Sequence, residues 1–260
     1  MTARPAEVPD AGWRARARGL GRGLLELLLP VACVACHRLL DAGEPGIVCG
    51  RCWSRLPALP YPRCERCGHP TGGRPCRWCE QLPPFVRAVR SVCWAHAGTG
   101  RDVVHALKYG GWEAAAAGMA ERMARLPWPP DVLAERAALV PVPLGAARQR
   151  ARGYNQSERL ARALTARVAL PVWDGVLVRG RDTASQTRLT PEQRLSNVSG
   201  AFRASAGAER QLRGAHLVLV DDVVTTAATL NACAAALLAA GARIVSYVTF
   251  GRAPTPADRT

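Results

Sequence analysis

The sequence has almost no lysine. Lys108 is the single lysine among 35 Lys and Arg residues, which outnumber the 20 Asp and Glu residues and give a formal net charge of +15. This bias toward arginine reflects genome composition as much as function, but guanidinium groups bind phosphates bidentately, so the composition favours polyanionic partners. Charge alone does not separate nucleic acid from a small phosphorylated substrate, or either from a basic surface with no special partner.

Long apolar runs are also absent. No run approaches the roughly twenty apolar residues that cross a bilayer, so we expect no membrane span. Residues 1–30 hold five arginines before a short leucine run that contains Glu26, a pattern that argues against a cleaved signal peptide. We expect a basic N-terminal segment with a short amphipathic helix, in a cytoplasmic protein. Walker, HExxH and GxSxG motifs are missing too, which removes the common phosphate-loop and hydrolase signatures.

Cysteine, in contrast, is concentrated in residues 31–80. Eight of the ten cysteines form four CxxC pairs: Cys33/Cys36, Cys49/Cys52, Cys64/Cys67 and Cys76/Cys79. Two such turns complete a tetrahedral zinc site, so eight thiolates predict two structural zinc ions in a small double zinc ribbon. The simplest pairing joins the first two turns and the last two, and an interleaved pairing stays open. The segment has little apolar content of its own, so metal would supply the folding energy.

Other readings of this segment are a disulfide framework and redox-active thiols. The lack of a secretion signal argues against disulfides, and the lack of a βαβ context argues against thioredoxin-like chemistry. His37 and His69 lie beside CxxC turns and could replace a thiolate, but four thiolates per site already suffice. Cys93 and Cys233 fall outside the pattern and read as small buried apolar residues.

Aromatic and basic residues are interleaved in the same segment. They would suit stacking on single-stranded nucleic acid, or the tryptophans could pack the small module against its neighbour. The residues are Trp53, Trp78, Arg51, Arg55, Arg66, Arg74 and Arg77.

A second informative stretch runs from Leu217 to Leu230. Its valine-rich start predicts a buried parallel strand, and apolar residues at helical spacing predict a following helix that ends near Gly241. Asp221 and Asp222 therefore lie at the carboxyl end of a strand, the edge where open α/β sheets bind ligands. A helix N-terminus with hydroxyls is suited to phosphate, and carboxylates accept hydrogen bonds from ribose hydroxyls. The hydroxyls belong to Thr225, Thr226 and Thr229.

The region from residue 85 to 252 alternates apolar segments with Gly and Pro, which predicts an α/β domain with residues 253–260 as a tail. We expect an edge strand at Val86 to Trp94 and a helical turn or two from Asp102 to Tyr109. Ala138 to Leu144 should form a buried strand that runs into a rigid turn. Asn155 with Glu158 predicts the capped start of another helix, whose polar residues face the same sheet edge as Asp221.

The next segment is less regular. We expect a strand from Leu170 to Val178, followed by a basic stretch to Asn197 that reads as a lid or as a surface loop. Thr190, Pro191 and Gln193 predict a short capped helix within it.

The stretch around Asp221 resembles the phosphoribosyl-pyrophosphate (PRPP) loop of type I phosphoribosyltransferases. That loop is an apolar strand followed by Asp-Asp, two apolar residues and Thr-Thr-Gly-Ala-Thr. The resemblance implies that Asp221 and Asp222 are the catalytic acids that contact ribose. It also implies that the 5′-phosphate is held by Thr225, Thr226, Ala227, Ala228 and Thr229. Ala227 stands where the family has Gly. Its methyl group would crowd the phosphate, or the residue would have to adopt a positive-φ conformation that Gly tolerates and Ala does not.

The chain as a whole resembles the ComF family over about residues 25–252. The motifs that carry the resemblance are the four CxxC pairs, Lys108-Tyr109-Gly110, Val140-Pro-Val-Pro-Leu144, Arg152-Gly-Tyr-Asn-Gln-Ser-Glu158, Gln186, Arg194, Asn197-Val198, Phe202 and the PRPP-type loop. It implies a type I phosphoribosyltransferase fold, a parallel sheet flanked by helices, fused to the double zinc ribbon. Members are associated with natural transformation and incoming single-stranded DNA.

On this resemblance we expect PRPP with Mg²⁺ as ligand and Zn²⁺ as structural metal. Arg148, Arg152 and Lys108 are candidates for the pyrophosphate end, Lys108 because a lone retained lysine suits a site that needs a compact ammonium. Single-stranded DNA and a competence or helicase-type protein are candidate partners. Two alternatives stay open: a DNA-binding adaptor with a degenerate phosphoribosyltransferase site, and a nucleotide salvage phosphoribosyltransferase.

Overall fold

A parallel four-stranded sheet forms the centre of the protein. The computed structural model describes residues 31–41, 44, 46–72, 74–110, 113–180, 200–255 and 258. The strands lie in the order β1-β6-β5-β2 and all neighbours pair in parallel. They are β1 (Val86–Trp94), β2 (Arg136–Pro141), β5 (His216–Val224) and β6 (Ile244–Arg252). The inner strands β5 and β6 are buried at almost every position, as their continuous apolar runs require.

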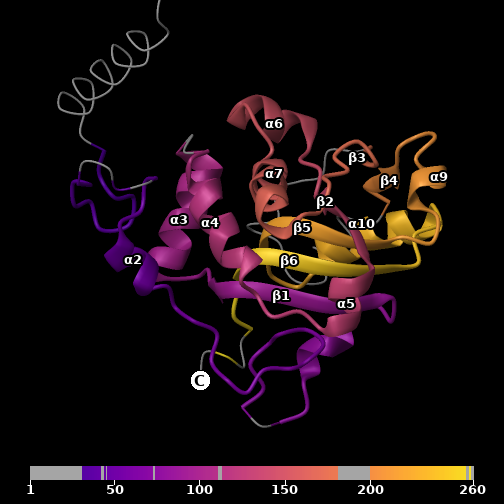
Figure 1. Cartoon of the computed structure of the whole chain (residues 1–260), viewed down its shortest axis with the longest axis horizontal. Coiled ribbons are helices and arrows are strands. Elements are labelled where there is room, and N and C mark those ends of the chain that lie inside the picture. Colours follow the sequence, from indigo (N-terminus) through magenta and orange to yellow (C-terminus); the bar gives the residue numbers. More distant parts are fainter. Residues whose placement is uncertain are drawn as a thin grey trace, which may run out of the picture.

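Helices cover both faces of this sheet (Figure 1). The helices of the domain are α3 (Gly98–Tyr109), α4 (Ala115–Ala124), α5 (Pro130–Glu135), α6 (Ala146–Arg152), α7 (Gln156–Val168), α9 (Glu209–Leu212) and α10 (Ala228–Ala239). Val218 and Val220 of β5 pack into the core formed with α3, α4 and α7. Leu217 and Leu219 point to the opposite core, which contains α10. The expected α/β fold is confirmed.

A small two-stranded sheet lies beyond the β2 edge of the main sheet. It pairs β3 (Leu177–Arg179) with β4 (Phe202–Ala204) in antiparallel fashion. The prediction of one continuous strand from Leu170 to Val178 is wrong. Val172 makes an isolated parallel bridge to Leu139, and the chain then turns before β3 begins. Pro171 cannot donate to a ladder and Asp174-Gly175 favours a turn, so the apolar run is split.

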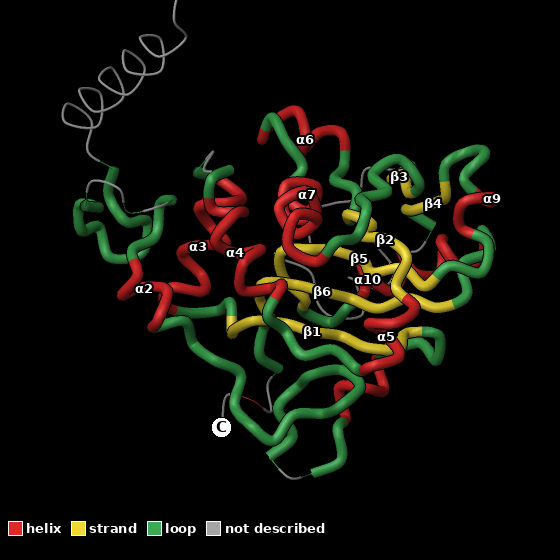
Figure 2. The backbone as a smooth tube through the Cα atoms, in the orientation of Figure 1, coloured by secondary structure: helices red, strands yellow, loops and turns green. Residues whose placement is uncertain are grey.

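The two cysteine modules lie at different places on the domain. The first contains α2 (Gly50–Ser54) and packs near α3 and α4, whereas the second contains the short 3₁₀ helix η1 (Arg77–Gln81) and lies below β1. Figure 2 shows that most of both modules is loop. The predicted domain boundaries stay predictions, and residues 1–30 and the Thr190–Gln193 helix lie outside the described residues. Among the described helices, none has the length and apolar character needed to cross a membrane.

Both tryptophans of the cysteine modules serve packing. Trp53 meets Phe250 edge to face at 6.2 Å, and Arg122 stacks over its ring at 3.7 Å. Trp78 is 2% exposed and stacks on His69. The sequence leaves open whether these rings stack on nucleic acid or pack the modules against the domain, and the structure favours packing.

Gly118 of α4 is the residue that admits Trp53. A methyl group on Gly118 would lie 2.5 Å from Cζ2 of Trp53. We therefore expect Gly118→Ala to destabilise the protein by about 1–3 kcal/mol through overpacking, although alanine is the better helix former. Chemical denaturation measures this change. Gly50→Ala is the matched control, since a methyl group there meets nothing within 4 Å, and an equal loss in both variants would contradict the docking role.

Candidate functional site

The loop between β5 and α10 carries the predicted ligand-binding residues. Strand β5 extends through Val224, so Asp221 and Asp222 lie near its carboxyl end. The threonines follow in the loop and in the first turn of α10. Ala227 is the N-cap of α10 with φ of 58°. The departure from glycine is therefore met by a left-handed alanine, a conformation that costs about 1–2 kcal/mol for a residue with a Cβ.

The two acids have separate partners from distant parts of the chain. Ser157 Oγ donates to Asp221 Oδ1 at 2.8 Å, and the backbone N–H of Asp222 donates to the same oxygen at 2.9 Å. Lys108 Nζ, at the end of α3, lies 3.0 Å from Asp222 Oδ2. The polar start of α7 thus faces the same sheet edge as Asp221, as predicted, and the single lysine of the chain is bound to the second acid.

These contacts shift the proton affinities of the group. Burial, together with the negative charge of Asp222, raises the pKa of Asp221 to about 7. Burial lowers the pKa of Lys108, but the charges of Asp222 and Asp221 outweigh it and the net pKa is above the ordinary value. At neutral pH Lys108 is therefore cationic while Asp221 is close to its titration midpoint.

One cavity of about 250 Å³ joins these residues. Its lining includes Asp221, Asp222, Lys108, Arg148, Arg152, Thr225, Ala227, Ala228 and Thr229. Of the predicted PRPP-binding residues, Thr226 does not line it, and its hydroxyl is buried without a hydrogen-bond partner in the described part of the chain. The site therefore places acids, hydroxyls, a helix N-terminus and basic groups around one space.

The basic side of the cavity comes from α3, α6 and β3. Arg152 donates to Gln156 Oε1 at 2.9 Å and stacks over Tyr109 at 4.9 Å. Tyr109, Gln156 and Arg179 also line the cavity, and we did not predict a ligand-binding role for them. Arg179 ends β3, which lies outside the four-stranded sheet, so no local pattern could have placed it at the cavity.

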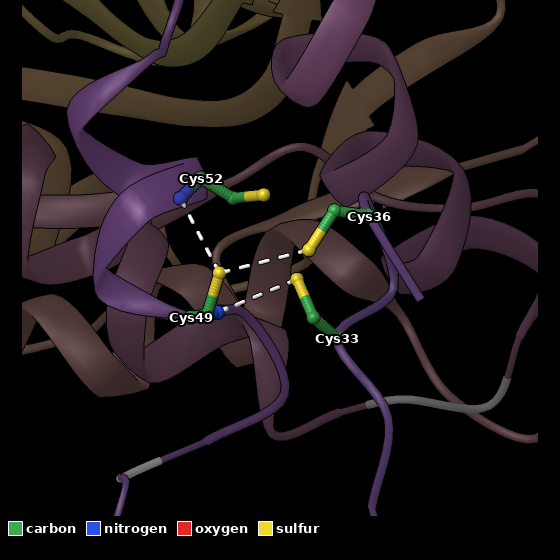
Figure 3. Close-up of side chains that lie close together, drawn as sticks. All are labelled: Cys33, Cys36, Cys49 and Cys52. Carbon is green, nitrogen blue, oxygen red and sulfur yellow. Dashed lines mark hydrogen bonds between the residues drawn. The ribbon is translucent and has the colours of Figure 1, made fainter. Parts of the chain in front are cut away.

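The first cysteine cluster has the geometry of a metal site (Figure 3). Sulfur atoms of Cys33, Cys36, Cys49 and Cys52 all lie within 4.8 Å of one another. The backbone N–H groups of Cys49 and Cys52 donate to the sulfurs of Cys33 and Cys49, both at 3.4 Å. Such N–H···S bonds favour thiolates, and four thiolates suit tetrahedral Zn²⁺.

The second cluster repeats the arrangement with Cys64, Cys67, Cys76 and Cys79. The structure thus pairs the CxxC turns in sequence order and not interleaved. His69 lies outside the cluster, with Nε2 3.1 Å from Asp258 Oδ1, and His37 is exposed. Cys93 is fully buried, and burial raises the pKa of its thiol to about 12, in keeping with a packing role.

Two family descriptions match the chain. Residues 24–83 match the double zinc ribbon domain and residues 150–259 match the phosphoribosyl transferase domain. The DNA utilization protein YhgH of Salmonella typhi is 34% identical over 234 residues, which covers 84% of this chain and 96% of the relative. The protein of the same name from Escherichia coli K12 is 34% identical over 229 residues, with the same two coverages.

Two further similarities cover less of the chain. Competence protein F of Haemophilus influenzae is 36% identical over 94 residues, 36% of this chain and 41% of the relative. Among solved structures, the glutamine PRPP amidotransferase from B. subtilis, complexed with ADP and GMP, matches with a TM-score of 0.33 and 19% identity over 58% of this chain and 27% of its own.

Proposed function

Because the chain belongs to the ComF family, with a double zinc ribbon and a phosphoribosyltransferase domain, we propose that the cavity binds PRPP with Mg²⁺. The observation that carries this proposal is that one cavity is lined by two acids, the N-terminus of α10 and three predicted cationic ligands. Each part matches one part of PRPP, a ribose with one phosphate and one pyrophosphate.

In this proposal the residues divide the ligand between them. Thr225, Thr229 and the backbone N–H groups at the start of α10 hold the 5′-phosphate, because a helix N-terminus presents unsatisfied donors. Asp221 and Asp222 accept hydrogen bonds from the ribose hydroxyls. Arg148 and Arg152 of α6 hold the pyrophosphate.

Lys108 has a different role from the two arginines. Its ammonium is bound to Asp222 in the structure, so its first role is to fix that carboxylate, and contact with pyrophosphate would require it to move.

The chemistry needs no nucleophilic side chain. As pyrophosphate leaves, positive charge develops on the ribose ring, and the two carboxylates beside the ring stabilise it while arginines stabilise the departing anion. Two carboxylates also suit Mg²⁺, which binds few protein oxygens and takes its other ligands from substrate phosphates. When bound with PRPP, Mg²⁺ would add positive charge at the pyrophosphate.

Equilibrium binding tests the proposal. Isothermal titration of the zinc-loaded protein should give saturable one-to-one binding of PRPP with Mg²⁺. Ribose 5-phosphate and pyrophosphate, each alone, should bind at least about tenfold more weakly, since each makes only part of the contacts. Equal affinity for pyrophosphate and PRPP would mean a general anion site and would refute the assignment of the acids to ribose.

The proton affinity of Asp221 predicts a pH dependence. Ionised Asp221 accepts hydrogen bonds better, and its pKa is about 7, so PRPP affinity should rise about tenfold from pH 6 to pH 8. Titrations in two buffers of different ionisation enthalpy should show proton release on binding near pH 7. Asp221→Asn should abolish both effects. A pH profile that is unchanged in this variant would contradict the role of Asp221.

The same raised pKa has a consequence for stability. The folded state holds the proton of Asp221 up to a higher pH than the unfolded state, so this group makes folding less favourable as pH rises from about 4 to about 7, and its contribution is constant above that. At pH 8 Asp221→Asn should therefore unfold at a higher temperature than the parent protein while it binds PRPP more weakly.

A second candidate function is contact with single-stranded DNA, which agrees with the name of the YhgH relatives. A groove of about 470 Å³ runs between the second cysteine module and the segment of residues 126–130. Tyr61, which is 75% exposed, lies under the guanidinium of Arg63 at 4.1 Å, and Trp128 lies under that of Arg90 at 5.8 Å. Aromatic rings flanked by arginine suit stacked bases. This groove is therefore the candidate DNA-binding surface in place of Trp53 and Trp78, which serve packing.

Salt dependence tests this candidate. Binding of a labelled oligothymidine, measured by fluorescence anisotropy, should weaken steeply between about 50 and 200 mM salt. Replacing Tyr61 and Trp128 by alanine should weaken it at least about tenfold, since each stacked base contributes about 1–3 kcal/mol. Leu133→Ala removes an exposed apolar side chain outside the groove and is the control. Equal affinity in all three proteins would exclude the groove.

A further inference from the structure

The second cysteine module is joined to the sheet through a buried arginine. Arg252, the last residue of β6, is fully buried and its guanidinium stacks over Trp78 at 4.3 Å. Its Nη2 donates to the backbone oxygen of Cys67 at 2.6 Å. A guanidinium keeps its proton at neutral pH even when it is buried. A full positive charge is therefore held inside the contact between the two parts.

Among the described residues no carboxylate forms an ion pair with Arg252, although the charge of Asp258 also acts on it. In the described part of the chain, Nε and Nη1 of Arg252 have no hydrogen-bond partner. A buried, incompletely paired guanidinium is costly unless a negative group lies nearby. Zn²⁺ bound by four thiolates is negative overall, and Arg252 contacts the backbone of Cys67 and the ring of Trp78 within this module. The zinc centre thus has the sign and the position to balance Arg252.

The backbone of Arg252 connects this contact to the loop of residues 225–229, which we call the phosphate loop. Arg252 pairs with Val224 in the β5–β6 ladder, and the N–H of Ala253 donates to the oxygen of Val224 at 2.8 Å. Val224 directly precedes Thr225. The strand end that delivers the loop is therefore fixed by the residue that faces the second cysteine cluster.

A separate contact reaches the other end of the loop. Asn231, in the first turn of α10, donates from Nδ2 to the backbone oxygen of Gln81 at 2.7 Å and accepts from the hydroxyl of Tyr247 at 3.0 Å. Gln81 ends η1, the helix that carries Cys79. Cys67, Trp78 and Leu82 also share one core with Ala227, Ala228 and Leu230 of the loop.

We propose that the second zinc centre holds the phosphate loop in its binding conformation, with Arg252 and Asn231 as the positioning residues. Zinc folds η1 and the CxxC turns, and these in turn fix the residues before and after Thr225–Thr229. The first zinc centre has no such role, because Cys33, Cys49 and Cys52 pack in the opposite core with α3 and α4. The proposal rests on PRPP binding only for its effect on affinity.

A pair of arginines allows a matched test. Arg252 stacks on Trp78 of the second module, and Arg122 stacks on Trp53 of the first. In the full zinc-loaded chain we expect Arg252→Met to release zinc to a chromogenic chelator about 10–100-fold faster from one of two sites, the range for lost outer contacts of a metal site. Hydrogen exchange over residues 224–231 should accelerate by a similar factor, and PRPP affinity should fall at least about tenfold. Arg252→Lys keeps the charge and should restore much of the zinc retention.

Arg122→Met should leave exchange over residues 224–231 and PRPP affinity within about twofold of the parent protein. If Arg252→Met does not fold, Asn231→Ala tests the separate contact of α10 with η1 without a change of buried charge, and it should also accelerate exchange in this segment. Unchanged exchange in the folded Arg252→Met protein, or in Asn231→Ala, would overturn the proposal, as would equal effects of Arg122→Met. Failure of the parent protein to bind PRPP would refute the proposed function instead, because zinc release and exchange are read without PRPP.

Discussion

Replacing Asp221 and Asp222 together by asparagine should lower the affinity for PRPP with Mg²⁺ by about 100-fold or more. Each carboxylate offers charge-assisted hydrogen bonds to the ribose hydroxyls, and such a bond contributes about 1.5–3 kcal/mol. Both side chains line the cavity, and Lys108 lies 3.0 Å from Asp222. Isothermal titration at pH 8, where Asp221 of the parent protein is ionised, should give the largest difference in PRPP affinity between the parent protein and the double variant.

The control for this experiment is Asp174→Asn. Asp174 pairs with Arg162 at 2.8 Å on the surface and does not line the cavity. It removes one carboxylate of a basic protein without touching the site, so PRPP affinity should stay within about twofold. A double variant of Asp221 and Asp222 that binds PRPP as tightly as Asp174→Asn would show that these acids do not contact the ligand.

Removal of zinc should have the second large effect. Elemental analysis should find two zinc ions per chain, one for each cluster of four thiols. Structural zinc contributes about 10–16 kcal/mol of binding free energy in small zinc peptides, which rivals the whole stability of a domain. Prolonged treatment with a strong chelator should therefore unfold both cysteine modules, and Cys67→Ser should reduce the zinc content to one.

Cys93→Ala is the control for the cysteine substitutions. Cys93 is fully buried, as Cys67 is, but it belongs to neither cluster. It should retain two zinc ions and lose only the stability expected for a small cavity. One zinc ion per chain in the parent protein, or a full zinc content in Cys67→Ser, would contradict the assignment of the two clusters.

Local sequence patterns predict much of this fold. The bounds of β1, the Asn155 cap of α7 and the order of strand, acids and threonines around Asp221 follow from short-range rules on burial, capping and turns. The CxxC spacing likewise predicts the two clusters because each turn is a local unit. These features need no knowledge of which elements meet in space.

The remainder depends on contacts between distant residues. The ion pair of Lys108 with Asp222 joins α3 to β5, and the stacking of Arg252 on Trp78 joins β6 to the second cysteine module. The apolar residues from Leu170 to Val178 suggest one strand, but Pro171 and the Asp174-Gly175 turn divide it. Tertiary geometry also decides that Trp53 packs inward while Tyr61 stays exposed.

A crystal structure of the zinc-loaded protein with PRPP and Mg²⁺ tests the central claim most directly. We expect the 5′-phosphate at the N-terminus of α10 beside Thr225 and Thr229, the ribose hydroxyls on Asp221 and Asp222, and pyrophosphate toward α6. PRPP bound elsewhere, or bound with its pyrophosphate in place of the 5′-phosphate, would contradict the account of the site.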